Sequence, residues 1–197
     1  MPPARADHDS RREAVSAAVW QVLAEHGFGG LTLRAVATAM GASTGLVTHY
    51  FSGKRELIAH ALDILETRTA HRPRPAPAAP GLPALRTHLL NILPLTPDGA
   101  AMNRIWVGSW DVALSDPDLF AAQTSRYERI RQVLRDCAAD AQRLGQLPEG
   151  DPDQVAATAL SFTHGLVVQA LFDPDRFTAA RQTELTDAFL AALAVSP

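Results

Sequence analysis

The strongest constraint on the fold is a proline-rich segment, HRPRPAPAAPGLP, at residues 71–83. Five of its residues are prolines, and each proline removes a backbone N–H donor and clashes with the preceding helical turn. The segment therefore cannot form a regular helix and favours an extended, semi-rigid linker. We expect two units, residues 1–70 and residues 71–197, with this linker opening the second. The linker either leaves the helix before it free to move or is an inert surface insertion.

Apolar residues recur at helical spacing on both sides of the linker, and strand signals are weak throughout. This pattern predicts an all-α fold of about nine helices. In the first unit, glycines and capping hydroxyls separate a long helix, two short helices and a longer fourth helix. In the second unit, proline and glycine positions bound the remaining helices. The expected ranges are about 10–27, 33–40, 43–51, 53–70, 82–93, 98–114, 117–144, 152–172 and 175–194.

Composition excludes several classes of protein. The chain has 18 basic and 21 acidic residues and a net charge of −3, so any contact with nucleic acid must be local. A single cysteine, Cys137, excludes an internal disulfide framework and fits a reducing compartment. The sequence shows neither a run of about eighteen apolar residues nor a signal-peptide pattern. We therefore expect a cytoplasmic protein with no membrane partner.

The common catalytic signatures HExxH and CxxC, and a glycine-rich phosphate loop, do not occur in the sequence. Acidic residues do gather at Asp111, Asp116 and Asp118. However, Asp116 precedes a proline and is typical of a helix cap, as are Asp151 and Asp173. We therefore expect no enzymatic activity, no metal site and no cofactor.

The stretch GASTGLVTHYFSGKREL, residues 41–57, is rich in small, hydroxyl and aromatic residues. Two short helices joined by a glycine-containing turn make a helix-turn-helix, whose second helix enters the major groove of DNA. A helix that lies against base edges needs a small or polar outer face, and the residues after Gly41 provide one. Leu46, Val47 and Phe51 would hold this helix to its own core. The glycine and serine would serve a purely structural turn and cap equally well.

The sequence assigns two kinds of DNA contact to this unit. The helix start at Ser43 and Thr44 offers free amides and a positive dipole end to a phosphate oxygen. Nearby hydroxyl, imidazole and ammonium groups position the protein, whereas Arg34, Thr44 and Thr48 are placed to discriminate bases. The candidate DNA-binding residues are Thr32, Arg34, Ser43, Thr44, Gly45, Thr48, His49, Tyr50 and Lys54.

The segment LTLRAVATAMGASTGLVTHYFSGKRELIAHAL resembles the DNA-binding domain of TetR-family transcriptional repressors. The family pattern runs from a threonine, through a Gly-x-Ser turn, to a Tyr-Phe pair followed by Lys-x-x-Leu. The matching residues are Thr32, Gly41, Ser43, Tyr50, Phe51, Lys54 and Leu57. The match covers roughly residues 10–65 and is most similar to the BetI-like branch. It departs at Thr48, where many members have a tyrosine, so one aromatic contact to DNA is lost.

The expected helix at 152–172 is apolar on nearly all sides, so more than one neighbour must cover it. A second copy of the chain would supply the other wall, with the last helix completing a four-helix interface about a two-fold axis. The resemblance implies the same, because TetR-like proteins dimerise through their last two long helices. Alternatively, both helices complete a monomeric core. The expected interface residues are Val167, Leu171, Leu185, Phe189 and Leu193.

Aromatic residues indicate a ligand site in the second unit. Trp106 and Trp110 are four residues apart and share a helix face with Asn103. Such a pair either lines a pocket that attracts an organic cation or is plain core. Polar residues on the apolar helix at 152–172 must also find partners. The candidate ligand-binding residues are Asn103, Trp106, Trp110, Tyr127, Phe162, His164 and Gln169. Resemblance to the BetI-like branch allows a choline-like or polyamine ligand.

Together these features predict a ligand-responsive DNA-binding transcriptional regulator, which we interpret as a repressor. Its expected partners are a palindromic double-stranded DNA operator, a small-molecule effector and a second copy of the chain. A ligand in the C-terminal bundle would favour a state in which the helix at 53–70 tilts and the DNA-binding helices leave their register. Two alternatives remain: a small-molecule-binding bundle without DNA regulation, and an activator.

Overall fold

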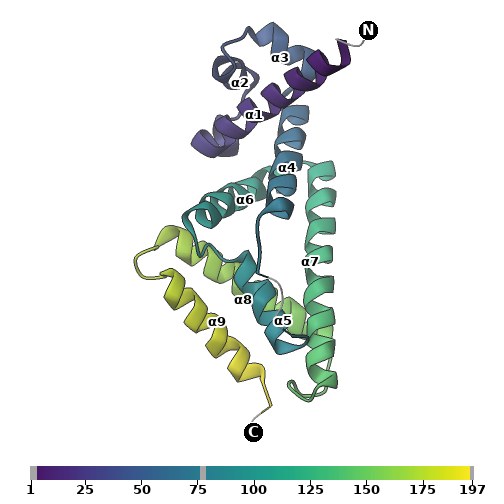
Figure 1. Ribbon diagram of the computed structural model, residues 1–197, viewed down its shortest axis with the longest axis vertical. Coiled ribbons are helices and arrows are strands. Elements are labelled where there is room, and N and C mark those ends of the chain that lie inside the picture. The colour runs from purple at the N-terminus through teal and green to yellow at the C-terminus, as the bar shows by residue number, and fades with distance from the viewer. Residues whose placement is uncertain (1–3, 76–78, 196–197) are drawn as a thin grey trace. The chain divides into compact units, whose positions relative to one another are not determined.

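The computed structural model describes residues 4–75 and 79–195, with side chains described from Arg11 onward. The described residues form nine α-helices and no strands, which confirms the all-α prediction (Figure 1). The helices are α1 (Ala4–Gly30), α2 (Leu33–Ala39), α3 (Thr44–Tyr50), α4 (Lys54–His71), α5 (Leu82–Ile92), α6 (Pro97–Ser115), α7 (Pro117–Arg143), α8 (Pro152–Phe172) and α9 (Ala179–Leu193).

The chain divides into two compact units. The N-terminal unit contains residues 1–72 and 105–119, and the C-terminal unit contains residues 73–104 and 120–197. Helices α6 and α7 therefore each contribute residues to both units. Residues 105–119 were expected in the second unit, because only the linker marks a boundary along the chain.

In the N-terminal unit, α1 packs against α2 and α4, and α2 packs against α3 (Figure 1). The side chains of Val15, Val19 and Leu23 lie four residues apart on α1 and are all buried, as their spacing predicts. Buried aliphatic residues from the other three helices complete this core. They include Val36, Val47, Leu57, Ile58 and Leu65.

Local signals in the sequence set the ends of α1 and α2. The φ of Gly27 is 63°, so the regular path of α1 is interrupted at the first of the predicted glycines. The Oγ1 of Thr32 accepts a hydrogen bond from the backbone N–H of Ala35 at 3.1 Å, which confirms Thr32 as the N-cap of α2. Gly41 has a φ of 62° in the turn after α2, a left-handed conformation that favours glycine.

In the C-terminal unit, α5 packs against α8 and α9. Its core consists of small and branched apolar side chains from α5, α7, α8 and α9. Arg86 on α5 makes a two-pronged ion pair with Asp187 on α9, with N–O distances of 2.5 and 2.9 Å. The largest buried members of the core are Leu85, Leu89, Leu134, Leu160 and Leu190.

Two helix starts differ from their predictions. Helix α1 begins at Ala4, earlier than the expected start near residue 10. Helix α9 begins at Ala179 rather than near residue 175, because Thr178 caps it through the backbone N–H of Arg181. The carboxylate of Asp173 accepts instead from the backbone N–H of Arg176 within the preceding turn. The predicted caps at Asp116 and Asp151 are confirmed.

Within the described part of the chain, α8 is the one helix long and apolar enough to cross a membrane by length and composition, with a mean hydropathy of 1.5. Its buried side chains, among them Ala156, Leu160 and Leu166, lie in the core of the unit. A core helix of a water-soluble protein has the same composition. We therefore interpret α8 as part of a helical core.

Candidate functional site

Helix α3 combines a buried inner side with an exposed outer side. Val47 is 0% exposed and Phe51 is buried, so these two side chains fix the helix to the core of the N-terminal unit. The other side presents small or polar residues, with no acidic residue in the helix. The exposed residues at its start and along it include Ser43, Thr44, Gly45, Thr48 and His49. This slim polar surface is what entry into a DNA groove requires.

Three details of α3 differ from the sequence-based expectation. Leu46 is 37% exposed, so Val47 and Phe51, without Leu46, anchor the helix. Ser43 occupies the N-cap position, but its side chain makes no capping hydrogen bond. The hydroxyl of Thr48 donates to the backbone carbonyl of Gly45 at 2.9 Å, which orients the Thr48 side chain. Ser43 and Thr48 therefore lie where the sequence places them, whereas the expectation that Leu46 faces the core was wrong.

The remaining candidate DNA-binding residues surround α3. Arg34 on α2 and Lys54 at the start of α4 are exposed. Thr32 is exposed as well, although its hydroxyl oxygen already caps α2. Tyr50 is half-buried, and its ring packs edge-on against His49 with 5.7 Å between ring centroids.

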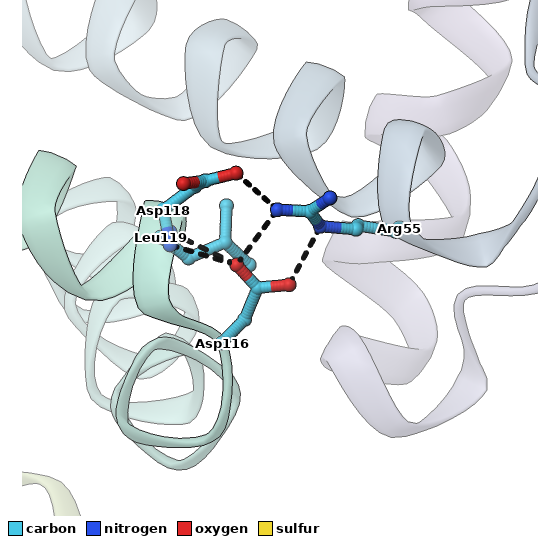
Figure 2. Close-up of polar contacts among 4 residues, drawn as sticks. All are labelled: Arg55, Asp116, Asp118 and Leu119. Carbon is cyan, nitrogen blue, oxygen red and sulfur yellow. Dashed lines mark hydrogen bonds and ion pairs between the residues drawn. The ribbon is translucent and has the colours of Figure 1, made fainter.

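Arg55 follows Lys54 in the same basic run but has a different role. Its guanidinium donates to both carboxylate oxygens of Asp116, from Nε at 2.7 Å and from one terminal nitrogen at 3.4 Å, and pairs with Asp118 (Figure 2). Asp116 also accepts the backbone N–H groups of Asp118 and Leu119, so one carboxylate caps α7 and binds Arg55. The hydrogen bond from Arg55, followed by the Leu119 amide, holds the pKa of Asp116 below its usual range.

The sequence pattern indicated that Asp116 is a helix cap but did not indicate its ion pair with Arg55. The only available signal was an acidic pair flanking Pro117, which a helix start explains without any partner. The two partners are 61 residues apart, so no local pattern links them.

The predicted ligand-binding residues fall in different units. Trp106 and Trp110 belong to the N-terminal unit, and the others belong to the C-terminal unit. Trp106 is 8% exposed, and its indole N–H donates to the hydroxyl of Thr69 on α4 at 2.9 Å. This burial favours the core interpretation for Trp106. Asn103 donates from its amide to the backbone carbonyls of Ile92 and Gly99, so it joins α6 to the end of α5.

Two aromatic ring pairs in the C-terminal unit contain three of the other candidates. The ring of His164 packs edge-on against Tyr127 with centroids 5.3 Å apart, and Phe162 stacks on Phe189 of α9 at 4.4 Å. Burial, together with the nearby Arg126, lowers the pKa of His164 to about 4, so its imidazole is neutral at pH 7. Gln169 is exposed, so water can satisfy its amide, and the prediction that it must find a protein or ligand partner was wrong.

The predicted dimer residues have unequal exposure within one chain. Val167 is 2% exposed and packs inside its own chain. Leu171, Leu185, Phe189 and Leu193 are half-buried. Phe172, at the end of α8, is 84% exposed, which is unusual for a large aromatic side chain.

Comparison with known families shows which family the chain belongs to. Residues 16–61 match the family model of bacterial regulatory proteins of the tetR family, and residues 82–195 match that of the BetI-type transcriptional repressor, C-terminal. The second match alone covers more than half of the chain. The chain belongs to the TetR family. Its C-terminal part is of the BetI type, as the resemblance implied.

Individual relatives agree with this assignment. The chain is 27% identical to the HTH-type transcriptional regulator PksA of Bacillus subtilis, over 88% of this chain and 85% of PksA. It is 31% identical to the HTH-type transcriptional regulator BetI of Burkholderia lata, over 68% of this chain and 70% of BetI. The TetR-family member described here is therefore a transcriptional regulator and not an enzyme, with an N-terminal DNA-binding domain.

Solved structures show the same fold. A transcriptional regulator from Rhodococcus sp. Rha1 matches with a TM-score of 0.77 and 25% identity, over 94% of this chain and 98% of that chain. A putative transcriptional regulator from Saccharomonospora viridis, solved in complex with choline, matches with a TM-score of 0.82 and 17% identity, over 96% of this chain and 100% of that chain. Because it is only 17% identical, the Saccharomonospora viridis regulator is similar to this chain in fold alone.

Proposed function

We propose that this TetR-family regulator binds a palindromic operator as a homodimer, represses transcription in the cytoplasm, and is released by a small-molecule effector. The observation that carries the proposal is the geometry of α3. Val47 and Phe51 hold the helix from behind, while its outer side carries small or polar residues apart from the exposed Leu46, and no acidic group. Two such helices, about one helical turn of DNA apart, would contact the two halves of a palindrome.

The exposed residues around α3 divide into two roles in this proposal. Thr44 and Thr48 on α3 and Arg34 on α2 contact base edges, and Gly45 lets the backbone approach them. Ser43, Tyr50, His49, Lys54 and Thr32 position the protein on the phosphate backbone. Lys54 is exposed at the start of α4, and no acidic residue of α3 opposes it.

We assign dimerisation to α8 and α9. Leu171 on α8 and Leu185, Phe189 and Leu193 on α9 are half-buried within one chain and would be covered further by a second copy. The stacked rings of Phe162 and Phe189 hold the two helices together within each chain. Because Val167 is already buried, the surface that a second copy covers consists of the half-buried residues rather than the whole predicted set.

We assign effector binding to the C-terminal unit, around Tyr127, Phe162 and His164. The aromatic surfaces and the neutral imidazole there suit an organic molecule. Choline and polyamines are the first compounds to test, since the relatives include BetI regulators and a structural neighbour was solved with choline. Screening a metabolite panel for thermal stabilisation identifies the effector, because a ligand that binds only the folded state raises its stability.

Gel-shift experiments with duplex DNA from the protein's own upstream region test the DNA-binding assignment. Thr44→Ala, Tyr50→Ala and Lys54→Ala should each weaken binding, whereas Arg143→Ala, an exposed change on α7, should not. Unaltered binding by all three variants would contradict the groove-binding role of α3. Transcript levels after deletion of the gene then separate a repressor from an activator, because loss of a repressor raises transcription of its target. If the wild type fails to bind this duplex or other candidate operators, a ligand-binding bundle without DNA regulation becomes the better interpretation.

A further inference from the structure

A cavity of about 240 Å³ lies beside the C-terminal end of α3 in the N-terminal unit. It is several times larger than the ~30 Å³ that one water molecule occupies in the liquid. Three helices contribute to it: α1, α3 and α4. Its lining residues are Arg12, Val15, His49, Tyr50, Phe51 and His60. The cavity therefore connects α3 with one cationic residue, Arg12, that sequence analysis did not assign to any function.

The walls of this cavity suit an anion. Arg12 and His49 are exposed and offer N–H donors, and Tyr50 contributes a phenolic hydroxyl. None of the described residues that line the cavity is acidic. A guanidinium next to a hydroxyl and an imidazole matches the oxygens of a phosphate group, to which arginine binds through two parallel hydrogen bonds.

The inner part of the cavity is neutral and fixed. The Nε2 of His60 lies 3.0 Å from the hydroxyl of Ser16, and its ring lies 5.2 Å from that of Phe51. Burial lowers the pKa of His60, Asp63 raises it and Arg12 lowers it, so the net shift is downward and the imidazole is uncharged at neutral pH. The positive charge of the cavity therefore comes from the guanidinium of Arg12.

We propose that this cavity binds one phosphate of the DNA backbone, and that Arg12 of α1 is the residue that contacts it together with Tyr50 and His49. The inference rests on the proposed DNA-binding function and extends it to α1. Among anions, a backbone phosphodiester is the occupant we favour, because His49 and Tyr50 belong to α3 itself. A phosphate held there would fix the distance between α3 and the DNA strand without reading its sequence.

Salt-dependent affinity measurements test the role of Arg12. The affinity of the full-length protein for operator DNA is measured by fluorescence anisotropy at several salt concentrations. Arg12→Ala should weaken binding about tenfold per half-site, the loss expected for one hydrogen-bonded charge. It should also reduce the slope of log affinity against log salt by about one per half-site. Arg12→Lys should keep most of the slope, and the matched surface variant Arg143→Ala should behave as wild type.

A second measurement locates the phosphate. A set of duplexes is prepared, each with one neutral methylphosphonate in place of one backbone phosphate. At the position whose phosphate would occupy the cavity, the methylphosphonate should lower the affinity of the wild type. It should not lower the affinity of Arg12→Ala any further, because that variant has already lost its contact with this phosphate. Equal penalties for both proteins at every position, or wild-type affinity and salt slope in Arg12→Ala, would overturn the proposal.

The two proposals fail in different ways. Failure of the wild type to bind any duplex contradicts the DNA-binding function itself. If the wild type binds DNA normally and Arg12→Ala does so equally well, only the phosphate assignment fails. Stabilisation of the wild type, but not of Arg12→Ala, by inorganic phosphate together with unchanged DNA binding would make the cavity a site for a free anion instead, and would also overturn the proposal.

Discussion

The Nε of Arg55 lies 2.7 Å from Oδ2 of Asp116, and the same carboxylate accepts the first backbone N–H groups of α7 (Figure 2). One side chain therefore caps α7 and holds the first turn of α4, the helix that directly follows the DNA-binding segment. Basic residues near a DNA-binding helix are commonly interpreted as phosphate contacts. In this protein only Lys54 of the adjacent pair is available for that role, because Arg55 is held by Asp116 and Asp118.

The double role of Asp116 predicts different effects for its two partners. Arg55→Ala removes only an exposed ion pair, so it should lower the melting temperature slightly, and the loss should shrink at high salt. Asp116→Ala also removes the cap of α7 and should therefore lower the melting temperature more than Arg55→Ala does. Asp116→Asn, which can still cap, should lie between them. Thermal unfolding at low and high salt measures the order, and equal losses for Arg55→Ala and Asp116→Ala would show that the cap contributes nothing.

Gly45 offers a test in which stability and DNA binding change in opposite directions. It is exposed near the start of α3 with ordinary helical backbone, and a Cβ there would meet only the Ser43 hydroxyl oxygen, at 3.8 Å. Gly45→Ala should therefore raise the free energy of unfolding by about 0.5–1 kcal/mol. The same methyl group would stand between α3 and the base edges, so operator affinity should fall. Chemical unfolding and gel shift measure the two effects, and unchanged affinity would mean that this part of α3 does not approach DNA closely.

Trp106 should behave as a core residue. Because its side chain is 8% exposed and its N–H donates to Thr69, Trp106→Ala should cost about 3–5 kcal/mol in the free energy of unfolding. Thr69→Val removes the acceptor of that hydrogen bond and also the hydroxyl that donates to the backbone carbonyl of Leu65, so it should cost about 1–3 kcal/mol. Urea unfolding of both variants gives these values. A Trp106→Ala protein with wild-type stability and a lost effector response would assign Trp106 to a ligand pocket instead.

His164 makes stability depend on pH. Its pKa is lowered to about 4 in the folded protein by burial and by Arg126, compared with about 6.5 in an unfolded chain. Well above pH 6.5 the imidazole of His164 is neutral in both the folded and the unfolded protein. As the pH falls toward 4, the imidazole in the unfolded protein binds a proton first. Stability should therefore fall by a few kcal/mol over this interval because of His164 alone.

The variant His164→Phe isolates this contribution, because phenylalanine keeps an aromatic ring against Tyr127 but does not titrate. Its free energy of unfolding, measured between pH 7 and pH 4, should fall less steeply than that of the wild type. Carboxylates also titrate in this range, but they do so in both proteins and cancel in the difference. Parallel curves for the two proteins would mean that the pKa of His164 is the same in the folded and unfolded states.

The sequence predicted the helices and their caps well because these features are local. Thr32, Asp116 and Asp151 bond to amides two or three residues away, so a short window contains both partners. The start of α9 was missed because Asp173 and Thr178 are both residue types that can form an N-cap. In the structure Asp173 accepts a hydrogen bond within a turn, and Thr178 caps the helix. Local patterns permit both choices, and only the packed structure selects one.

Residue roles that depend on distant partners could not be predicted in this way. Helical spacing allows either Leu46 or Val47 to face inward, and packing leaves Leu46 outside. Gln169 lies on an apolar helix, but it is exposed on the face that the rest of its chain leaves uncovered. The cavity that contains Arg12 needs three helices to form, and none of them indicates it alone.

The sequence by itself determined that this chain is helical, that it carries a helix-turn-helix, and which family it belongs to. These features are local, because hydrophobic periodicity, helix caps and turn glycines depend on residues close together in the chain. The tertiary structure alone decided which charges are free for DNA. Arg55 and Asp116 meet across 61 positions, and Arg12 joins His49 and Tyr50 at one cavity. Such pairings are set by how helices pack, since a charged side chain binds whichever partner the fold brings within a few ångströms.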